Sequence, residues 1–177
     1  EPHLRALRPA RRRHPQGDGH AGAARKDSVE QLFLVGEIVV EQRVVSADAL
    51  RHVAGCTVCN DYAVRDDLEN WYRPNLRAKN RDGATVLGPW LVSADEVDDP
   101  QALALRTFVT GKVTQQGTTA DMVHDVTSLI EYLSSFMTLL PGDVILTGTP
   151  EGVVNVNAGD EVVCEIDGIG RLVSTLV

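Results

Sequence analysis

Residues 55–66 read G-C-T-V-C-N-D-Y-A-V-R-D and join a short apolar run to a group of charged residues that begins at Asp61. The run at 56–61 has the length of a strand, and it ends in Asn-Asp. Side chains at strand ends project toward the mouth of a β structure, where binding sites form. Carboxylate oxygens are the ligands that hard cations such as Mg²⁺ prefer, so Asp61 is a candidate metal ligand. A solvated acidic loop is the alternative that composition alone favours.

Strands and one short helix are predicted on both sides of this stretch. The apolar run at 32–40 predicts a buried strand or two short ones. Residues 46–54 predict a short helix with Ser46 as its N-cap. The alternating segment 103–109, followed by a Gly turn and V-T-Q-Q, predicts a β-hairpin.

The clearest helix is predicted over residues 126–140, with Asp125 as its N-cap and Pro141 directly after it. Short strands with Gly-containing turns follow at 143–147, 160–166 and 170–177. Many short strands with few helices indicate an α+β domain that is mostly β.

Residues 1–27 differ in composition from the rest of the 177-residue chain. They contain the Arg run 11–13, prolines and glycines, and almost no apolar periodicity, which is typical of a flexible N-terminal arm. A transit peptide and a nucleic-acid-binding arm are the alternatives. Residues 28–177 are expected to form one folded domain, since the chain has 43% hydrophobic and 24% charged residues.

The net charge of −8 is distributed unevenly along the chain. Residues 1–26 carry seven Lys or Arg and two acids, whereas the remainder carries ten bases and 23 acids. An acidic body repels phosphate backbones, so nucleic acid is not expected as a partner. An anionic substrate would need a cation at the site. We expect a cytoplasmic protein without membrane association, because no apolar stretch reaches the ~18 residues that span a bilayer.

Three cysteines, Cys56, Cys59 and Cys164, are too few for a disulfide framework. The C-T-V-C spacing also occurs in redox and zinc motifs, but no second pair follows it. We therefore interpret Cys56 and Cys59 as structural residues on a strand.

Four motifs together resemble the fumarylacetoacetate hydrolase superfamily: residues 55–66, W-Y-R-P-N-L-R-A-K-N-R-D-G (71–83), Q-Q-G (115–117) and L-T-G-T-P-E-G (146–152). The resemblance extends over residues 45–177. Its E-N-W-Y-R-P-N-L and K-N-R-D-G segments are most similar to the isomerase/decarboxylase branch of homoprotocatechuate (4-hydroxyphenylacetate) degradation. The resemblance implies a mixed β-roll of the C-terminal-domain type with short flanking helices. It also implies a homodimer, and Mg²⁺ or Mn²⁺ held by a Glu-x-Glu pair and an Asp.

The resemblance also assigns roles to individual residues. Asp61 matches the metal-binding Asp, and Lys79 matches a lysine whose ammonium stabilises an enolate oxyanion. Thr149 corresponds to a threonine near the substrate carboxylate, with Gly148 and Gly152 allowing close backbone approach. The alternative for Lys79 is an exposed lysine beside Arg77 and Arg81. The alternative for Thr149 is that its segment is only a turn that ends a strand.

Two further residues are candidates for substrate binding. Tyr72 lies where an aromatic hydroxyl often points at substrate, although packing beside Trp71 explains it equally well. Arg65 suits the distal carboxylate of a diacid, because a guanidinium matches a carboxylate in shape and charge. Orientation of Asp61 or Asp66 is the alternative role for Arg65.

The Glu-x-Glu pair is incomplete. Positions 31 and 29 residues before Asp61 hold Glu30 and Leu32. In the other alignment Glu37 is the second glutamate, and Val35 occupies the partner position. Asp61, Glu37 and Glu30 are therefore the candidate metal ligands, and one carboxylate of the family pattern is missing in either alignment.

The implied activity is metal-dependent decarboxylation and/or isomerisation of a 2-oxo or 2-hydroxy-diene diacid in aromatic-compound catabolism. The implied substrates are of the 5-oxopent-3-ene-1,2,5-tricarboxylate or 2-hydroxyhepta-2,4-diene-1,7-dioate type. One alternative is an acylpyruvate or fumarylpyruvate hydrolase, which needs a base to activate water. The other is a catalytically degenerate member of the family that still dimerises.

Overall fold

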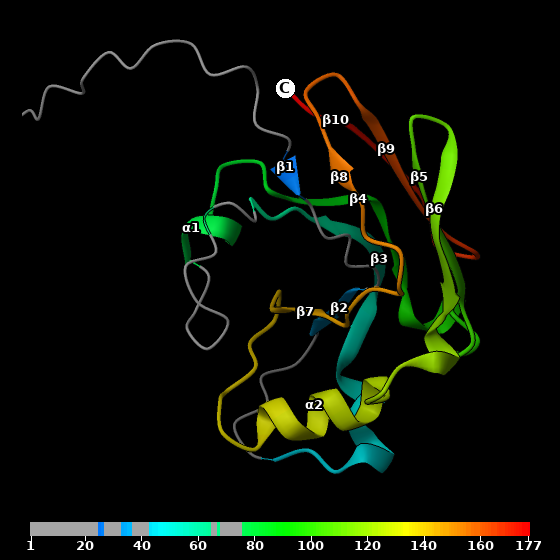
Figure 1. Cartoon of the computed structure of the whole chain (residues 1–177). Helices are drawn as coiled ribbons and strands as arrows, with labels where there is room; N and C mark the ends of the chain where they lie inside the picture. The colour runs from blue at the N-terminus through cyan, green and yellow to red at the C-terminus, as the bar shows by residue number, and fades with distance from the viewer. Residues whose placement is uncertain (1–24, 27–32, 37–42, 65–66, 68–75) are drawn as a thin grey trace, which may run out of the picture.

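Two four-stranded antiparallel sheets dominate the computed structural model, which describes residues 25–26, 33–36, 43–64, 67 and 76–177 (Figure 1). The first sheet has the order β4 (Thr85–Ser93), β3 (Val53–Asp61), β2 (Phe33–Gly36), β7 (Val144–Leu146). The second has the order β10 (Gly170–Thr175), β9 (Glu161–Ile166), β5 (Ala104–Val109), β6 (Lys112–Thr118). A short antiparallel pair joins β1 (Arg25–Lys26) to β8 (Asn155–Val156).

Strand β3 is the centre of the core. All but one of its residues are buried, since it lies inside its own sheet and contacts β9 and β10 of the other. Val58, Val162, Cys164 and Ile166 are each at most 1% exposed and belong to the core cluster. The predicted strand at 56–61 is confirmed, and it begins earlier, at Val53.

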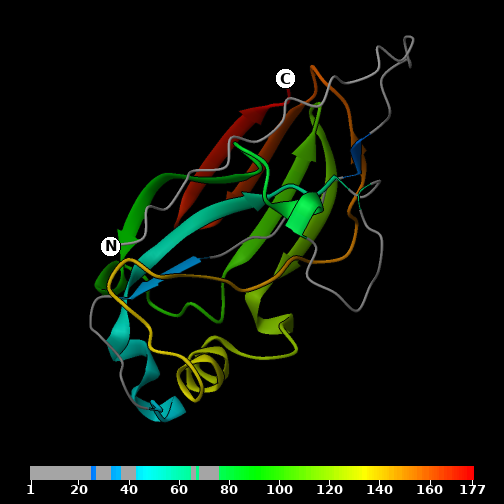
Figure 2. The same ribbon diagram turned by 90° about the vertical axis from the view of Figure 1, so that its left-hand side faces the viewer.

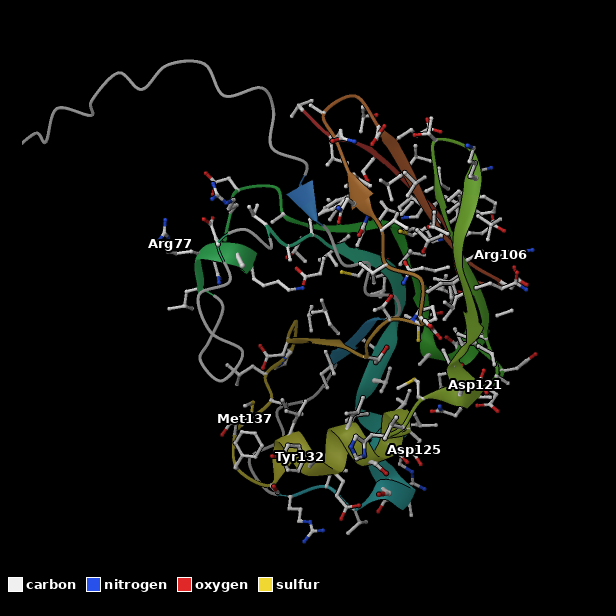
Figure 3. The ribbon with its side chains drawn as sticks, in the orientation of Figure 1. Arg77, Arg106, Asp121, Asp125, Tyr132 and Met137 are labelled. Atoms are coloured by element: carbon white, nitrogen blue, oxygen red, sulfur yellow. The ribbon has the colours of Figure 1, made fainter. Side chains whose placement is uncertain are left out.

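The helical elements α2 (Val126–Ser134) and η1, a 3-10 helix at Ser46–His52, lie together at one end of the sheets (Figure 2). Asp125 is the N-cap of α2, as predicted, because its Oδ1 accepts the Ser128 backbone N–H at 2.6 Å (Figure 3). The predicted end of this helix at residue 140 is wrong. The Ser135 hydroxyl donates to the Tyr132 carbonyl at 2.6 Å and helps satisfy a terminal carbonyl of the shorter helix.

The N-cap predicted at Ser46 is also wrong. Val45 occupies the cap position of η1, and Ser46 instead donates its backbone N–H and its hydroxyl to the Glu131 carboxylate on α2. Arg43 pairs with the same carboxylate. These hydrogen bonds, first that from the Ser46 side chain, hold the pKa of Glu131 below its usual value. A tertiary contact with α2 has thus taken the side chain that the local pattern assigns to a cap.

The other predicted strands are present with slightly different bounds. The segments 143–147, 160–166 and 170–177 form β7, β9 and β10, and 103–109 with the residues after it forms the hairpin β5–β6. Part of the 32–40 run forms β2, and residues 37–40 lie outside the described residues.

No strand is predicted at 85–93, where β4 is found. Gly88 and Pro89 interrupt its apolar pattern, and both residues weaken a strand assignment. The structure accommodates them with a register shift between β3 and β4 at Cys56/Val58. Five short elements are also unpredicted: the strands β1 and β8, and the helical turns α1 (Leu76–Lys79), η3 (Ala94–Glu96) and η4 (Thr119–Asp121). The class, α+β and mostly β with short flanking helices, is confirmed.

The three cysteines are buried. Burial raises the pKa of the Cys56 thiol to about 11 and that of the Cys164 thiol to about 12. Cys56 and Cys59 are 2% and 0% exposed on β3, as the structural interpretation predicts. No helix in the described part of the chain is long and apolar enough to cross a membrane.

Candidate functional site

Asp61 ends β3 at a position that is 8% exposed. Thr85 is its cross-strand partner on β4, and the Thr85 hydroxyl donates to Asp61 Oδ1 at 2.8 Å. Lys79 Nζ donates to Asp61 Oδ2, and it lies 3.4 Å from the Asp61 backbone oxygen, to which it also donates. The two residues that the sequence assigns to the chemistry, Asp61 and Lys79, are therefore in direct contact.

Backbone hydrogen bonds place Lys79 beside the end of β3. The chain that leaves β3 runs next to α1, since the Val64 N–H donates to the Ala78 carbonyl at 2.9 Å. The Tyr62 N–H donates to the Ala84 carbonyl at 2.8 Å. Ala78 is 1% exposed and anchors the short helix, so its neighbour Lys79 is held over the strand end.

The lysine is not the exposed residue of the alternative interpretation. Its side chain is 30% exposed and that of Asp61 is 11% exposed, whereas Arg77 and Arg81 are mostly solvated and pair with Asp67. Water is partly excluded from the Asp61–Lys79 pair, which strengthens the attraction between the charges and also costs them part of their hydration. The role of Lys79 in catalysis stays a prediction.

The second candidate group is the T-G-T-P-E-G segment at 147–152, which follows β7 and lies against β6. Gln115 on β6 donates its side-chain N–H groups to the Thr149 hydroxyl at 2.8 Å and to the Pro150 carbonyl at 2.7 Å. A Cβ atom built on Gly117 would lie 2.9 Å from the Pro150 Cβ. The Q-Q-G and T-G-T-P-E-G motifs, far apart in sequence, thus form one packed unit.

The two glycines of this loop have different surroundings. A Cβ on Gly152 would lie 2.2 Å from the Thr114 carbonyl oxygen, so Gly152 permits close backbone approach. That approach is to strand β6. A Cβ on Gly148 would meet nothing within 4 Å, and its φ of +112° is what favours glycine there.

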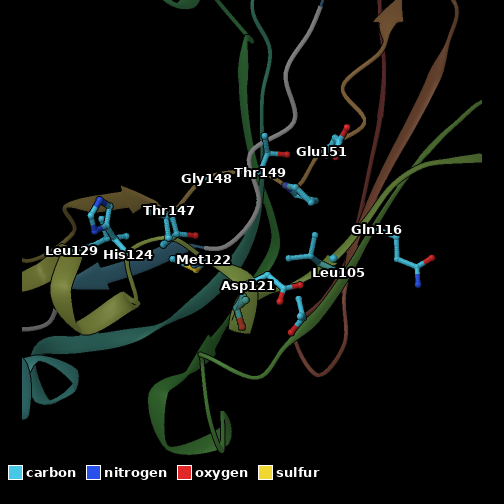
Figure 4. Close-up of a pocket in the computed structure, with 15 residues that line it drawn as sticks. Leu105, Gln116, Asp121, Met122, His124, Leu129, Thr147, Gly148, Thr149 and Glu151 are labelled. Carbon is cyan, nitrogen blue, oxygen red and sulfur yellow. The ribbon is translucent and has the colours of Figure 1, made fainter.

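Thr149 lines a pocket of about 550 Å³ between the end of the β5–β6 hairpin and the 147–151 loop (Figure 4). Its polar lining includes Gln116, Asp121, His124, Thr147 and Glu151. Asp61 and Lys79 do not line this pocket. The described residues therefore present two groups, Asp61–Lys79–Thr85 at the end of β3 and Thr149–Gln115 beside β6.

The carboxylate oxygens of Asp61 are of the type that binds a hard cation, but the described residues bring few such oxygens together. Among the described residues, no three or more His, Cys, Asp or Glu side chains lie close enough to hold a metal ion. Asp61 supplies one carboxylate, and its oxygens already accept from Thr85 and Lys79. The other predicted ligands, Glu30 and Glu37, lie outside the described residues, as do Arg65 and Tyr72.

The sequence motifs assign no role to two residues that the structure places in these groups. Thr85 escapes notice because its strand is not predicted, so its register with Asp61 is not predictable either. Gln115 belongs to the Q-Q-G motif. The feature that could have identified it is a polar side chain at an inward-facing position of a hairpin strand.

Comparison with known proteins identifies the family. The model of the fumarylacetoacetate (FAA) hydrolase C-terminal domain matches residues 33–177. The chain belongs to this family. It is 54% identical over 163 residues to the 4-hydroxyphenylacetate degradation bifunctional isomerase/decarboxylase of Salmonella dublin, a match that covers 89% of this chain and 38% of that protein.

Two other relatives are also similar over most of this chain. The maleylpyruvate hydrolase of Aquipseudomonas alcaligenes is 40% identical over 153 residues, covering 86% of this chain and 51% of that protein. The crystal structure of 2-hydroxyhepta-2,4-diene-1,7-dioate isomerase from Mycobacterium marinum matches with a TM-score of 0.76 and 40% identity, covering 84% of this chain and 57% of that one. The chain thus spans between about two fifths and somewhat more than half of these proteins.

Proposed function

We propose that this domain catalyses the decarboxylation and/or isomerisation of a 2-oxo or 2-hydroxy-diene diacid in aromatic-compound catabolism, with bound Mg²⁺ or Mn²⁺. The substrates would be of the 5-oxopent-3-ene-1,2,5-tricarboxylate or 2-hydroxyhepta-2,4-diene-1,7-dioate type. The observation that carries the proposal is the Lys79 ammonium paired with Asp61 at the end of β3. Support comes from the 54% identity to an isomerase/decarboxylase.

Both reactions develop negative charge on an oxygen next to the bond that changes. Loss of CO₂ leaves its bonding electron pair on the remaining carbon skeleton as a dienolate. Isomerisation of the 2-hydroxy-diene releases the proton of the 2-hydroxyl group to solvent and gives the same kind of anion, and uptake of a proton from solvent at a different carbon completes it. No activated water is required in either case.

Lys79 can stabilise this anion because its positive charge lies in a site that partly excludes water. Asp61 orients the lysine side chain through Oδ2, and Thr85 orients the carboxylate through Oδ1. A divalent cation, with Asp61 and Glu30 or Glu37 as its ligands, would supply Lewis-acid stabilisation of the substrate 2-oxo oxygen. We propose Thr149 as a hydrogen-bond donor to a substrate carboxylate, and Arg65 and Tyr72 as further contacts.

The direct test is conversion of 2-hydroxyhepta-2,4-diene-1,7-dioate by the purified protein in Mg²⁺ buffer. The expected result is a loss of the ultraviolet absorbance of the conjugated diene, and a much slower loss after treatment with EDTA. With the tricarboxylate substrate, release of CO₂ is expected. A protein that changes neither substrate at micromolar enzyme concentration would contradict the proposal.

A hydrolase is the second candidate, favoured by the 40% identity to a maleylpyruvate hydrolase. It would add water across a carbon–carbon bond of an acylpyruvate or fumarylpyruvate and release pyruvate. Pyruvate formation from fumarylpyruvate, detected with lactate dehydrogenase and NADH, would favour this candidate over the first. Absence of turnover on every substrate would favour a degenerate member of the family.

We also propose that the domain assembles as a homodimer, as the family resemblance implies. The chain has a mass of 19.2 kDa, so light scattering coupled to size exclusion should give about twice that value. A mass equal to that of one chain at micromolar concentration would contradict this assembly.

A further inference from the structure

We propose that Gln115 is a positioning residue for Thr149. Its buried amide fixes the direction of the Thr149 hydroxyl, so that this hydroxyl acts as a hydrogen-bond donor toward a substrate carboxylate. The proposal rests on the proposed function of Thr149 and adds a residue that acts through it.

The orientation of the Gln115 amide follows from its partners. The side chain is 2% exposed, and one amide atom lies 2.7 Å from the Pro150 carbonyl oxygen. A carbonyl oxygen only accepts hydrogen bonds, so this amide atom is the nitrogen Nε2. The same nitrogen lies 2.8 Å from Thr149 Oγ1. Both N–H groups of Nε2 are therefore directed at the 149–150 segment.

The direction of the Thr149 proton follows in turn. A threonine hydroxyl has one hydrogen to donate and two lone pairs that accept. Because Gln115 donates to Oγ1, the Thr149 hydrogen must point away from Gln115. Thr149 lines the pocket of Figure 4, so a ligand bound there meets a donor. An ionised carboxylate, which only accepts, is the group that suits this donor.

The rest of the Gln115 amide supports a functional reason for its presence. Its oxygen Oε1 is buried and has no hydrogen-bond partner among the described residues. Such a group lowers stability, and an apolar side chain of similar size would avoid the cost. The two N–H donors are then what the amide contributes at this position.

The strand that carries Gln115 also holds the loop at a fixed distance. Gly117 lies against Pro150, and Gly152 lies against the Thr114 backbone. These contacts flank Gln115 along β6 and fix the part of the loop that directly follows Thr149, which limits how far Thr149 can shift.

A double-mutant cycle with Gln115→Leu and Thr149→Val tests this proposal. The readouts are KM and kcat with 2-hydroxyhepta-2,4-diene-1,7-dioate, and the affinity for oxalate, a small dicarboxylate, measured by calorimetry in Mg²⁺ buffer. A hydrogen bond to a charged group is worth enough to raise KM by about tenfold or more when it is lost. Each single variant is expected to show this rise in KM and a matching loss of oxalate affinity, with kcat changed less.

The double variant decides between positioning and general support of the fold. If Gln115 acts through Thr149, the double variant is no worse than Thr149→Val alone, since the second change removes nothing further. Gln101→Leu is the matched control. Gln101 is another bridging glutamine, whose Oε1 accepts the Val126 N–H at 2.9 Å, so its loss should lower Tm and leave KM within about twofold.

Three outcomes would overturn the proposal. The first is that the two changes raise KM independently, so that their effects multiply in the double variant. The second is a Gln115→Leu variant with a lower Tm but unchanged KM and oxalate affinity, and the third is a wild-type protein that binds no oxalate. A wild-type protein that binds oxalate but converts no dienedioate would sink the proposed function instead. The oxalate titration then still decides the role of Gln115.

Discussion

Two glycines in the 147–152 loop offer a matched test of how that loop is held. Gly148 has φ +112° and Gly152 has φ +109°, so an alanine at either position is held at nearly the same unfavourable positive φ. They differ in what an added methyl group meets. At Gly148 it meets nothing within 4 Å, whereas at Gly152 it would lie 2.2 Å from the Thr114 carbonyl oxygen.

The expected loss of stability follows from these two contributions. A non-glycine residue at positive φ costs about 1–3 kcal/mol, and the reduced freedom of the unfolded chain returns about 0.4–1 kcal/mol. Gly148→Ala should therefore destabilise the domain by about 1–2 kcal/mol. At Gly152 the contact must also open by about 0.8 Å to reach the 3.0 Å that real Cβ atoms keep. Overpacking of this kind adds about 1–3 kcal/mol.

Urea unfolding monitored by tryptophan fluorescence measures both variants against the wild-type protein. We expect the free energy of unfolding to fall by about 1–3 kcal/mol more in Gly152→Ala than in Gly148→Ala, with similar m-values. Equal losses in the two variants would refute the reasoning, because the loop would then not be pressed against β6.

Three further predictions concern the metal, the helix cap and the thiols. Calorimetric titration with Mn²⁺ should show binding that Asp61→Asn weakens at least about tenfold, since a carboxylate ligand is lost; equal affinities would exclude Asp61 as a ligand. Asp125→Ala should lower the free energy of unfolding by about 1 kcal/mol, as typical for an N-cap. The pKa of Asp125 is held below its ordinary value of 3.8, chiefly by the hydrogen bond from the Ser128 backbone. The contribution of the ionised Asp125 to the free energy of unfolding is therefore fully present above pH 3.8. It is lost as the pH falls through the lowered pKa, and a stability gap to the variant that stays constant down to pH 2 would contradict this linkage. The native protein should react slowly with a thiol reagent at pH 8, because burial raises the pKa of Cys56 to about 11 and of Cys164 to about 12; one thiol modified within the mixing time would contradict the burial.

Sequence patterns predict those parts of the fold that local chemistry controls. The strand ending at Asp61, the β5–β6 hairpin and the Asp125 cap all follow from residues near one another in sequence. Ser46 shows the limit, since a distant glutamate on α2 takes its hydroxyl. The apolar pattern after Ser134 misleads for a related reason, because Phe136 and Met137 are exposed and do not continue a buried stripe.

In the candidate site, too, some residues follow from local sequence and others only from long-range contacts. Asp61, Lys79 and Thr149 are identified by motifs, but their partners Thr85 and Gln115 depend on which strand lies opposite and which loop packs against it. Those long-range pairings are properties of the folded chain and leave little trace in local sequence. The predictions for Glu30, Glu37, Arg65 and Tyr72 fall outside the described residues.

Replacement of one lysine tests the central proposal most directly. The rate of dienedioate conversion should be compared for the wild-type protein, Lys79→Met and Lys112→Met, where Lys112 is an exposed lysine on β6. Removal of a charge that stabilises a developing oxyanion should lower kcat by about 100-fold or more in Lys79→Met. Lys112→Met should match the wild-type protein. Equal rates in the two lysine variants would contradict the assignment of Lys79, and with it the chemistry proposed for the Asp61–Lys79 pair.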